Sequence, residues 1–192
     1  MDPTPTRERL LDAAARVFRQ HGYAAASMEQ VRQAAGVSNG SLYHHFPTKA
    51  QLADALYAQI LQDFHLALLA AIRHAGSAEV GVKGLVRAFV NWVLRHPDRA
   101  ALLHKLRREG DVTDASESVS AANTEALGTL RQWVEQQVAQ GQIADMPFHV
   151  WMALVFSPAM SMTGRWVKEA RASVPPRVRA ALENGAWKAV AP

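Results

Sequence analysis

The side chains best suited to chemistry crowd into one short stretch, residues 39–45 (NGSLYHH). Leu42 and Phe46 lie four residues apart, so on a helix they share one face and anchor it inward. The remaining groups then point outward: Asn39, Gly40, Ser41, Tyr43 and His44. They are short or planar hydrogen-bonding groups beside a glycine that permits close approach. Such a surface fits the base edges and phosphates of a DNA major groove.

Catalytic and metal-binding patterns are missing from the sequence. It contains no HExxH motif, nucleophile elbow, P-loop or dinucleotide fingerprint. With no cysteine it has no disulfide, thiolate metal site or cysteine nucleophile, which suits a reducing cytoplasm. His44 and His45 are adjacent, so on a helix they are expected to point apart and not to share a metal. We therefore expect a cytoplasmic protein with no metal, no cofactor and no enzymatic activity.

Two short helices joined by a tight turn are expected to position residues 39–45. Ser27 and Gln30 form a capping box, in which the serine hydroxyl accepts from the backbone three residues on and the glutamine amide reaches back. The helix that begins there ends at Gly36, and the next helix runs from about Ser38 to His45. A short turn between two helices is the connection that a helix-turn-helix requires.

Local signals also delimit the helices on either side. A first helix begins at Thr6, which is placed to cap it, and ends at Gly22 in the left-handed conformation. Pro47 closes the helix of residues 39–45. Thr48 and Gln51 form a second capping box, which opens a long helix to about residue 73.

The rest of the chain has helical periodicity and no alternating run of β-branched residues. Turn signals divide it into predicted helices over 78–95, 98–109, 121–140 and 147–172 and a last helix from 175, with a loop over 110–120. The sequence thus predicts an all-α fold of about nine helices. We expect a helix-turn-helix DNA-binding domain over residues 1–50 and a larger helical ligand-binding and dimerisation domain over residues 51–192.

The net charge of +4 is compatible with a polyanionic partner. Lys49 lies in the first turn of a helix, where a cation is mildly unfavourable, so a phosphate partner would explain its presence. No signal peptide is apparent, and residues 146–164, although free of Lys, Arg, Asp and Glu, carry prolines and polar groups. That stretch predicts a helix buried inside protein and not a membrane span.

Residues 27–49 and the helix before them resemble the DNA-binding head of the TetR family of repressors. The matching positions are Leu11, Ala14, Phe18, Gly22, Ser27, 35–38, 41–43, 45–46 and Lys49. The rest of the chain resembles that family only in length and helical make-up. Two positions depart from the family pattern. Asn39 stands where a basic residue or proline is frequent, and Arg32 stands where the family usually has a small alanine, so the stem of Arg32 is expected to extend out of the head.

The resemblance implies a set of DNA contacts. They comprise Ser27, Ser38, Asn39, Gly40, Ser41, Tyr43, His44, His45 and Lys49. Asn39 and Ser41 would read bases, and an asparagine can pair bidentately with adenine. Ser27, Tyr43 and Lys49 would contact phosphates. The other interpretation of this region is an ordinary αα-hairpin with surface side chains.

A single recognition helix buries too little surface for tight specific binding to DNA. We therefore expect a homodimer on a palindromic operator, with its two DNA-binding heads about 34–36 Å apart. A ridge of small residues in the uncharged helix favours close approach of a partner helix: Ala153, Ser157, Ser161 and Gly164. Val178 and Leu182 of the last helix would complete a four-helix bundle, as in TetR-like proteins. The alternative is that the ridge packs only within its own subunit.

Methionine and aromatic side chains of the body predict an effector pocket. Trp133, Phe156 and Met160 would line it, with His104 or Arg107 as the polar contact, unless these residues are ordinary core. The expected function is that of a repressor released from double-stranded DNA by a small apolar or aromatic effector. The alternatives are an activator and an effector-independent DNA-binding protein of the same fold.

Overall fold

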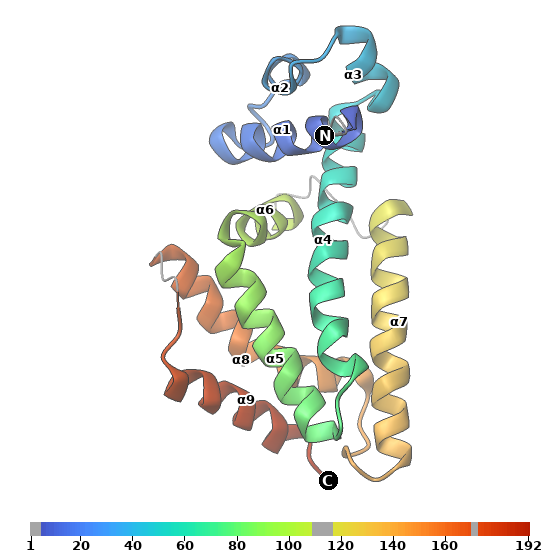
Figure 1. Ribbon diagram of the computed structural model, residues 1–192, viewed down its shortest axis with the longest axis vertical. Coiled ribbons are helices and arrows are strands. Elements are labelled where there is room, and N and C mark those ends of the chain that lie inside the picture. Colours follow the sequence, from blue (N-terminus) through green and yellow to red (C-terminus); the bar gives the residue numbers. More distant parts are fainter. Residues whose placement is uncertain (1–4, 109–116, 170–172) are drawn as a thin grey trace. The chain divides into compact units, whose positions relative to one another are not determined.

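The computed structural model describes residues 5–108, 117–169 and 173–192 of the 192-residue chain (Figure 1). Within these ranges all regular structure is helical, as the sequence predicts. The helices are α1 (Thr6–His21), α2 (Met28–Ala35), α3 (Asn39–His45), α4 (Lys49–Arg73), α5 (Ala78–Arg95), α6 (Pro97–Arg108), α7 (Glu117–Ala139), α8 (Phe148–Lys168) and α9 (Pro176–Val190).

Most helix ends of the N-terminal region follow the local signals. Ser27 and Gln30 form both halves of the predicted capping box, and Gly36 ends α2 in the left-handed conformation (φ 63°, ψ 42°). Two predictions at α1 are wrong. Thr6 is the first helical residue and makes no side-chain cap, because Pro5 precedes the helix. Gly22 has a positive φ of 77° but a ψ of 160°, so its backbone is not left-handed helical.

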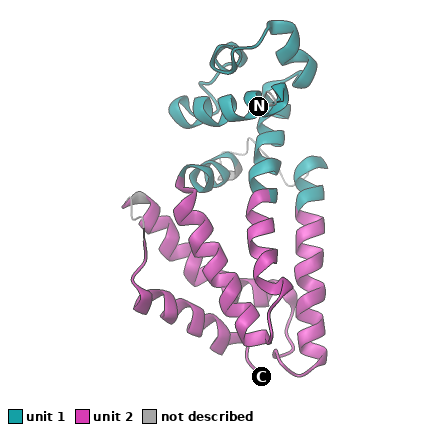
Figure 2. Cartoon of the chain, viewed as in Figure 1, with its two compact units in different colours: residues 1–62, 98–122 teal, residues 63–97, 123–192 magenta. Residues whose placement is uncertain are grey.

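The helices form two compact units (Figure 2). The first comprises residues 1–62 and 98–122, and therefore α1, α2, α3, the first half of α4, nearly all of α6 and the start of α7. The second comprises residues 63–97 and 123–192. The predicted DNA-binding head lies wholly within the first unit.

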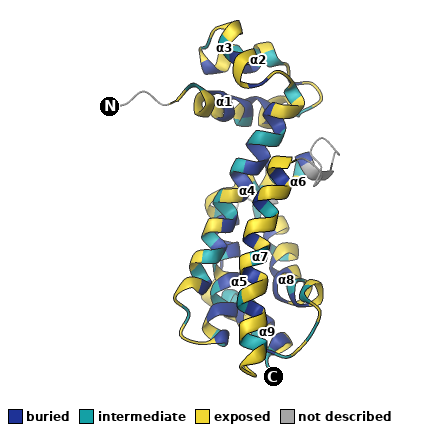
Figure 3. Cartoon of the chain, turned by 90° about the vertical axis from the view of Figure 1, so that its right-hand side faces the viewer, coloured by how far each residue is buried: buried dark blue, intermediate teal, exposed yellow. Residues whose placement is uncertain are grey.

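The first unit is built on the packing of α1 against α2. Both helices bury one apolar face completely, and α3 adds Leu42 to the same core (Figure 3). The fully buried side chains of α1 and α2 are Leu10, Leu11, Ala13, Ala14, Phe18 and Val31. Burial of a leucine or phenylalanine contributes about 1.5–3 kcal/mol, so each of the large side chains in this core stabilises the head.

In the second unit α5, α8 and α9 pack against one another (Figure 1). The uncharged stretch predicted to be a buried helix is α8, whose inward side holds Trp151, Val155, Ala159, Thr163 and Trp166. The helix with the composition of a membrane span is α4, with a mean hydropathy of 1.4. Within the 18-residue window of α4 that has this hydropathy, 44% is buried inside the structure.

A partly buried ion pair joins α9 to α5. The Arg87 guanidinium donates Nε–H to Glu183 Oε1 (2.9 Å) and an Nη2–H to Glu183 Oε2 (2.5 Å). Glu183 is almost fully buried, and this two-point contact compensates the loss of water around its carboxylate.

Candidate nucleic-acid interface

Helix α3 presents one polar face to solvent. Leu42 is fully buried and Phe46 is 4% exposed, which confirms the two predicted anchors. Tyr43 is 47% exposed, and Asn39, Gly40, His44 and His45 are exposed as well, while Ser41 is half-buried. A helix of only seven residues has little stability of its own, so its polar face depends on these two anchors.

Two of the predicted contact residues have structural roles in the described structure. The Ser38 hydroxyl accepts from Ser41 N–H (3.2 Å) and caps α3. The Ser27 hydroxyl accepts from Gln30 N–H (3.2 Å), and Ser27 N–H donates to Gln30 Oε1 (2.8 Å). Both serines therefore fix helix N-termini, whose remaining N–H groups are suited to a phosphate.

The two histidines of α3 lie closer together than the sequence predicted. Their ring centroids are 5.3 Å apart in an edge-to-face arrangement, so the side chains do not point apart. Among the described residues no group of three or more His, Asp or Glu side chains is arranged to hold a metal ion. His44 and His45 thus remain exposed hydrogen-bonding groups next to Tyr43.

The Lys49 ammonium, predicted to contact a phosphate, is surrounded by backbone carbonyls in the described structure. Its Nζ donates to the carbonyls of Tyr23 (2.9 Å), Ala24 (3.2 Å) and Ala26 (3.0 Å), and it lies 4.5 Å from the centroid of the Tyr23 ring. An ammonium has three protons, and all three are bound here. Backbone carbonyls of the α1–α2 turn therefore offset the helix dipole at Lys49, and its contact with a phosphate stays a prediction.

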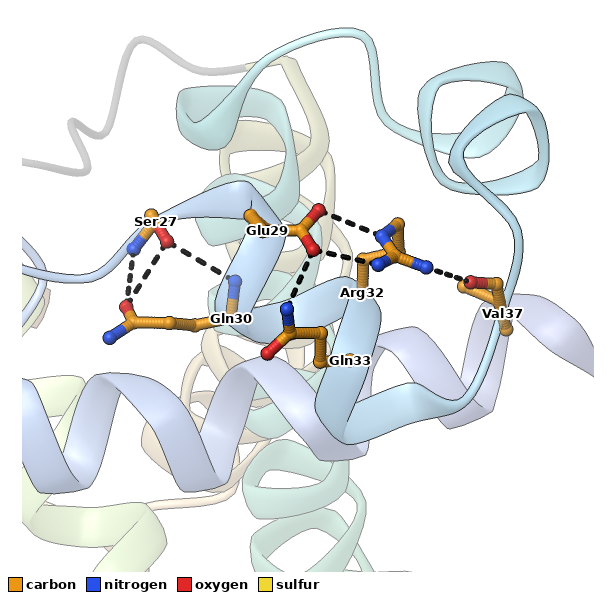
Figure 4. Close-up of polar contacts among 6 residues, drawn as sticks. All are labelled: Ser27, Glu29, Gln30, Arg32, Gln33 and Val37. Carbon is orange, nitrogen blue, oxygen red and sulfur yellow. Dashed lines mark hydrogen bonds and ion pairs between the residues drawn. The ribbon is translucent and has the colours of Figure 1, made fainter.

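Arg32, one of the two departures from the family pattern, also makes internal contacts (Figure 4). Its guanidinium bonds to Glu29 (2.7 and 2.8 Å) and donates to the Val37 carbonyl in the α2–α3 turn (3.1 Å). Glu29 also accepts from the Gln33 amide (2.7 Å). The hydrogen bond from Arg32, with that from Gln33, lowers the pKa of Glu29 to about 2.

Arg9 and Arg16 were not expected among the site residues. Both lie on α1 and donate to backbone carbonyls at the end of α2. Their spacing of seven residues places them on one face of α1, a signal that the sequence contains. Only the packing of α1 against α2 reveals what that face meets.

Comparisons with known proteins agree with this geometry. Residues 10–56 match the family model described as bacterial regulatory proteins, tetR family. UidR of Escherichia coli K12, an HTH-type transcriptional regulator, is 44% identical over 64 residues, or 33% of this chain and 31% of UidR. NicS of Pseudomonas putida, an HTH-type transcriptional repressor, is 26% identical over 141 residues, or 73% of this chain and 66% of NicS.

The crystal structure of a TetR family transcription regulator from Marinobacter aquaeolei VT8 superposes with a TM-score of 0.82. It is 22% identical, and the superposition covers 97% of this chain and 95% of that one, so the likeness of fold extends through the body. Residues 10–56 of this chain therefore belong to the TetR family, and the described chain shares the fold of TetR family regulators. Its alignments with curated relatives span less than two thirds of their length, about a third in the case of UidR.

The residues predicted to line an effector pocket do not all face inward. Phe156 is buried, with its ring centroid 6.0 Å from that of Phe89, and Trp133 is half-buried with its ring against Gly81. Met160 is 57% exposed on the outer side of α8. The prediction that Met160 lines a pocket is therefore wrong. His104 is exposed and belongs to the other unit, and the Arg107 side chain lies outside the described residues.

The small-residue ridge of α8 faces outward. Ala153, Ser157, Ser161 and Gly164 are all exposed, and Gly164 has no atom within 4 Å of where a Cβ would stand. The alternative that this ridge packs within its own subunit is therefore wrong. Val178 and Leu182 on α9 are half-buried.

We expect Lys49→Met to destabilise the head. The substitution keeps most of the stem but removes the Nζ donor shared by the carbonyls of Tyr23, Ala24 and Ala26, of which, among the described residues, only Tyr23 keeps a backbone donor, Ala26 N–H, at a cost of about 1–3 kcal/mol. Denaturant unfolding monitored by circular dichroism measures the loss. Lys188→Met, at an exposed position on α9, is the matched control and is expected to change stability by less than about 0.5 kcal/mol. Equal midpoints for the two variants contradict the clamping role of Lys49.

The pKa of Glu29 generates a pH prediction. Because the folded state lowers this pKa from 4.5 to about 2, the ionised carboxylate stabilises the head above about pH 4.5. That contribution is lost as the pH falls through 4.5 towards 2. A carbon-detected NMR titration is expected to place the Glu29 midpoint near 2, and Arg32→Ala is expected to move it up towards 4.5. A midpoint that is the same in both proteins contradicts the pairing with Arg32.

Proposed function

We propose that the chain is a transcriptional repressor that binds a palindromic DNA operator as a homodimer and is released by a small apolar or aromatic effector. The observation that carries the proposal is the polar face of α3, seated by Leu42 and Phe46 within a TetR-family head. The repressors among the relatives, such as NicS, support this direction of regulation.

The roles on α3 follow from side-chain chemistry. Asn39 is exposed at the start of the helix, and its amide can donate to and accept from an adenine edge. Tyr43 extends a hydroxyl from the same face towards the phosphate backbone. Ser41, His44 and His45 add donors and acceptors, and Gly40 lets the helix approach the duplex closely.

Dimerisation through α8 is supported by its two unlike faces. The inward face carries Trp151 and Trp166, whereas the outward face carries the exposed small-residue ridge with Val150 and Leu154 beside it. Small side chains allow a second α8 to approach closely along the ridge. Two-fold symmetry would place the same ridge on both sides of the interface.

An effector of aromatic or apolar character is supported by a chain of rings in the second unit. Phe64 lies 5.8 Å from Phe89, Phe89 lies 6.0 Å from Phe156, and Phe156 lies 6.4 Å from Trp151, measured between ring centroids. Trp151 is fully buried, and its indole N–H has no acceptor among the described residues. An effector with an acceptor oxygen would satisfy that donor.

Release would act through α4, which continues without a break from Lys49 in the first unit to Arg73 in the second. An effector that binds one arrangement of the body more tightly shifts the population towards it. Lys49 bonds the first turn of α4 to the α1–α2 turn, so a displacement of α4 would be transmitted to the head.

The DNA-binding proposal predicts that Tyr43→Ala weakens binding to a duplex selected from randomised sequence by about 30-fold, because the dimer loses one hydrogen bond of about 1 kcal/mol in each of its two half-sites. Because Tyr43 is 47% exposed, thermal unfolding is expected to be unchanged. Asn39→Ala is expected to relax preference at one base pair of each half-site. If selection from randomised duplexes with the wild-type protein enriches no symmetric sequence, the DNA-binding proposal is contradicted.

The dimer proposal predicts that Ser157→Arg converts the protein to monomers. Symmetry introduces the bulky charge twice at the same interface, where it is not compensated. Sedimentation equilibrium is expected to give twice 21.0 kDa for the wild type and 21.0 kDa for the variant. Ser120→Arg, exposed on α7, is the control and should leave the dimer intact. A dimeric Ser157→Arg protein would show that α8 is not the interface.

A further inference from the structure

Four consecutive backbone carbonyls in the α2–α3 region each accept a hydrogen bond from an arginine. Arg16 donates to Ala34 (3.2 Å). Arg9 donates to both Ala35 (2.7 Å) and Gly36 (3.1 Å). Arg32 donates to Val37 (3.1 Å), as Figure 4 shows. Three guanidinium groups therefore converge on residues 34–37 from two helices; we name Arg9, Arg16 and Arg32 the turn clamp.

The position of these carbonyls explains the need for the turn clamp. The N–H groups of Gly36 and Val37 donate to the carbonyls of Gln33 (3.1 Å) and Arg32 (3.3 Å), the pairing of a Schellman motif. Residues 34–37 lie beyond the reach of that motif, so their carbonyls need other donors. They also lie at the negative end of the α2 dipole, where cations are favourable.

The turn clamp is itself held in place. Glu29 bonds the Arg32 guanidinium at two points, and Gln33 donates to the same carboxylate. Arg9 approaches Gly36 so closely that a Cβ there would lie 3.4 Å from its terminal nitrogen. The contacts from Arg9 to Ala35 and from Arg32 to Val37 are partly buried, whereas that from Arg16 is exposed. Arg9 and Arg32 are therefore the stronger members.

We propose that the turn clamp positions α3 for DNA recognition by fixing the turn that enters it. This inference rests on the proposed function, in which α3 reads the operator. Apart from its N-cap, α3 is held by two buried side chains, Leu42 within the helix and Phe46 directly after it. These two side chains fix how closely α3 lies to the core, but they constrain the direction of its axis less. The carbonyls of residues 34–37 lead directly into Ser38, the N-cap of α3, so holding them sets the angle of the helix.

The competing role for these arginines is direct contact with DNA phosphates. A charge-preserving substitution separates the two roles. Lysine keeps the positive charge that a phosphate requires, but it lacks the planar fork that reaches two carbonyls or bridges a carboxylate and a carbonyl. The test therefore uses the full-length double variant Arg9→Lys/Arg32→Lys. Arg19→Lys is the control, because Arg19 lies on the same α1 helix but pairs with Asp98 on α6.

The first measurement is amide hydrogen exchange without DNA. We expect exchange in residues 39–45 of the double variant to accelerate about tenfold relative to the wild type, while the buried amides of α1 keep their protection. Arg9→Gln/Arg32→Gln is expected to accelerate it further. If either double variant loses the protection of α1 as well, the single Arg32→Lys variant supplies the comparison. If residues 39–45 of the double variant exchange at the same rate as in the wild type, the proposal that the turn clamp positions α3 is overturned.

The second measurement is affinity for a duplex selected with the wild-type protein, taken at several salt concentrations. We expect the lysine double variant to bind about tenfold more weakly, equal to 1.4 kcal/mol, with an unchanged slope of log K against log salt. A lysine double variant that binds as tightly as the wild type, together with a slope shallower by about 0.9 for each arginine replaced in Arg9→Gln/Arg32→Gln, identifies phosphate contacts and overturns the positioning role. If the wild type binds no duplex, the proposed function fails, and hydrogen exchange alone decides the clamp.

Discussion

The structure of the head depends on the burial of Leu42. Helix α3 has seven residues, too few to persist alone in water, and the exclusion of this side chain from solvent attaches it to the α1–α2 core. Phe46 closes the same face one turn later. With these two side chains buried, the rotation of α3 about its own axis is determined. Tyr43 and His44 are then exposed as a geometric consequence of where Leu42 lies.

The cations of the head act mainly on its own backbone. Lys49 binds the α1–α2 turn, the turn clamp binds the α2–α3 region, and Arg7 lies over the ring of Phe46 at 5.7 Å. Helix α3 itself contains no lysine or arginine. Recognition by such a helix relies on the placement of neutral donors and acceptors, and these need an exact orientation more than a charged side chain does.

The second unit separates two tasks between the faces of α8. Its inward face contributes Trp151 and Phe156 to the aromatic chain, and its outward face leaves a row of small side chains exposed. A helix with no charged residue over most of its length allows both, because neither face then has an ion to hydrate. Pairing of the outward faces would keep the inward aromatic chain separate from the dimer contact.

The sequence by itself determined the features that depend on neighbours three or four residues apart. The capping box of Ser27 with Gln30, the end of α2 at Gly36 and the common face of Leu42 and Phe46 are of this kind. Only the tertiary structure decided what the long cationic side chains meet and which way Met160 faces. Lys49 reaches carbonyls 23–26 residues away, and Arg9 reaches carbonyls 26 and 27 residues away. Such contacts arise when helices pack, and the flexible stem of a lysine or arginine is compatible with many partners until packing selects one.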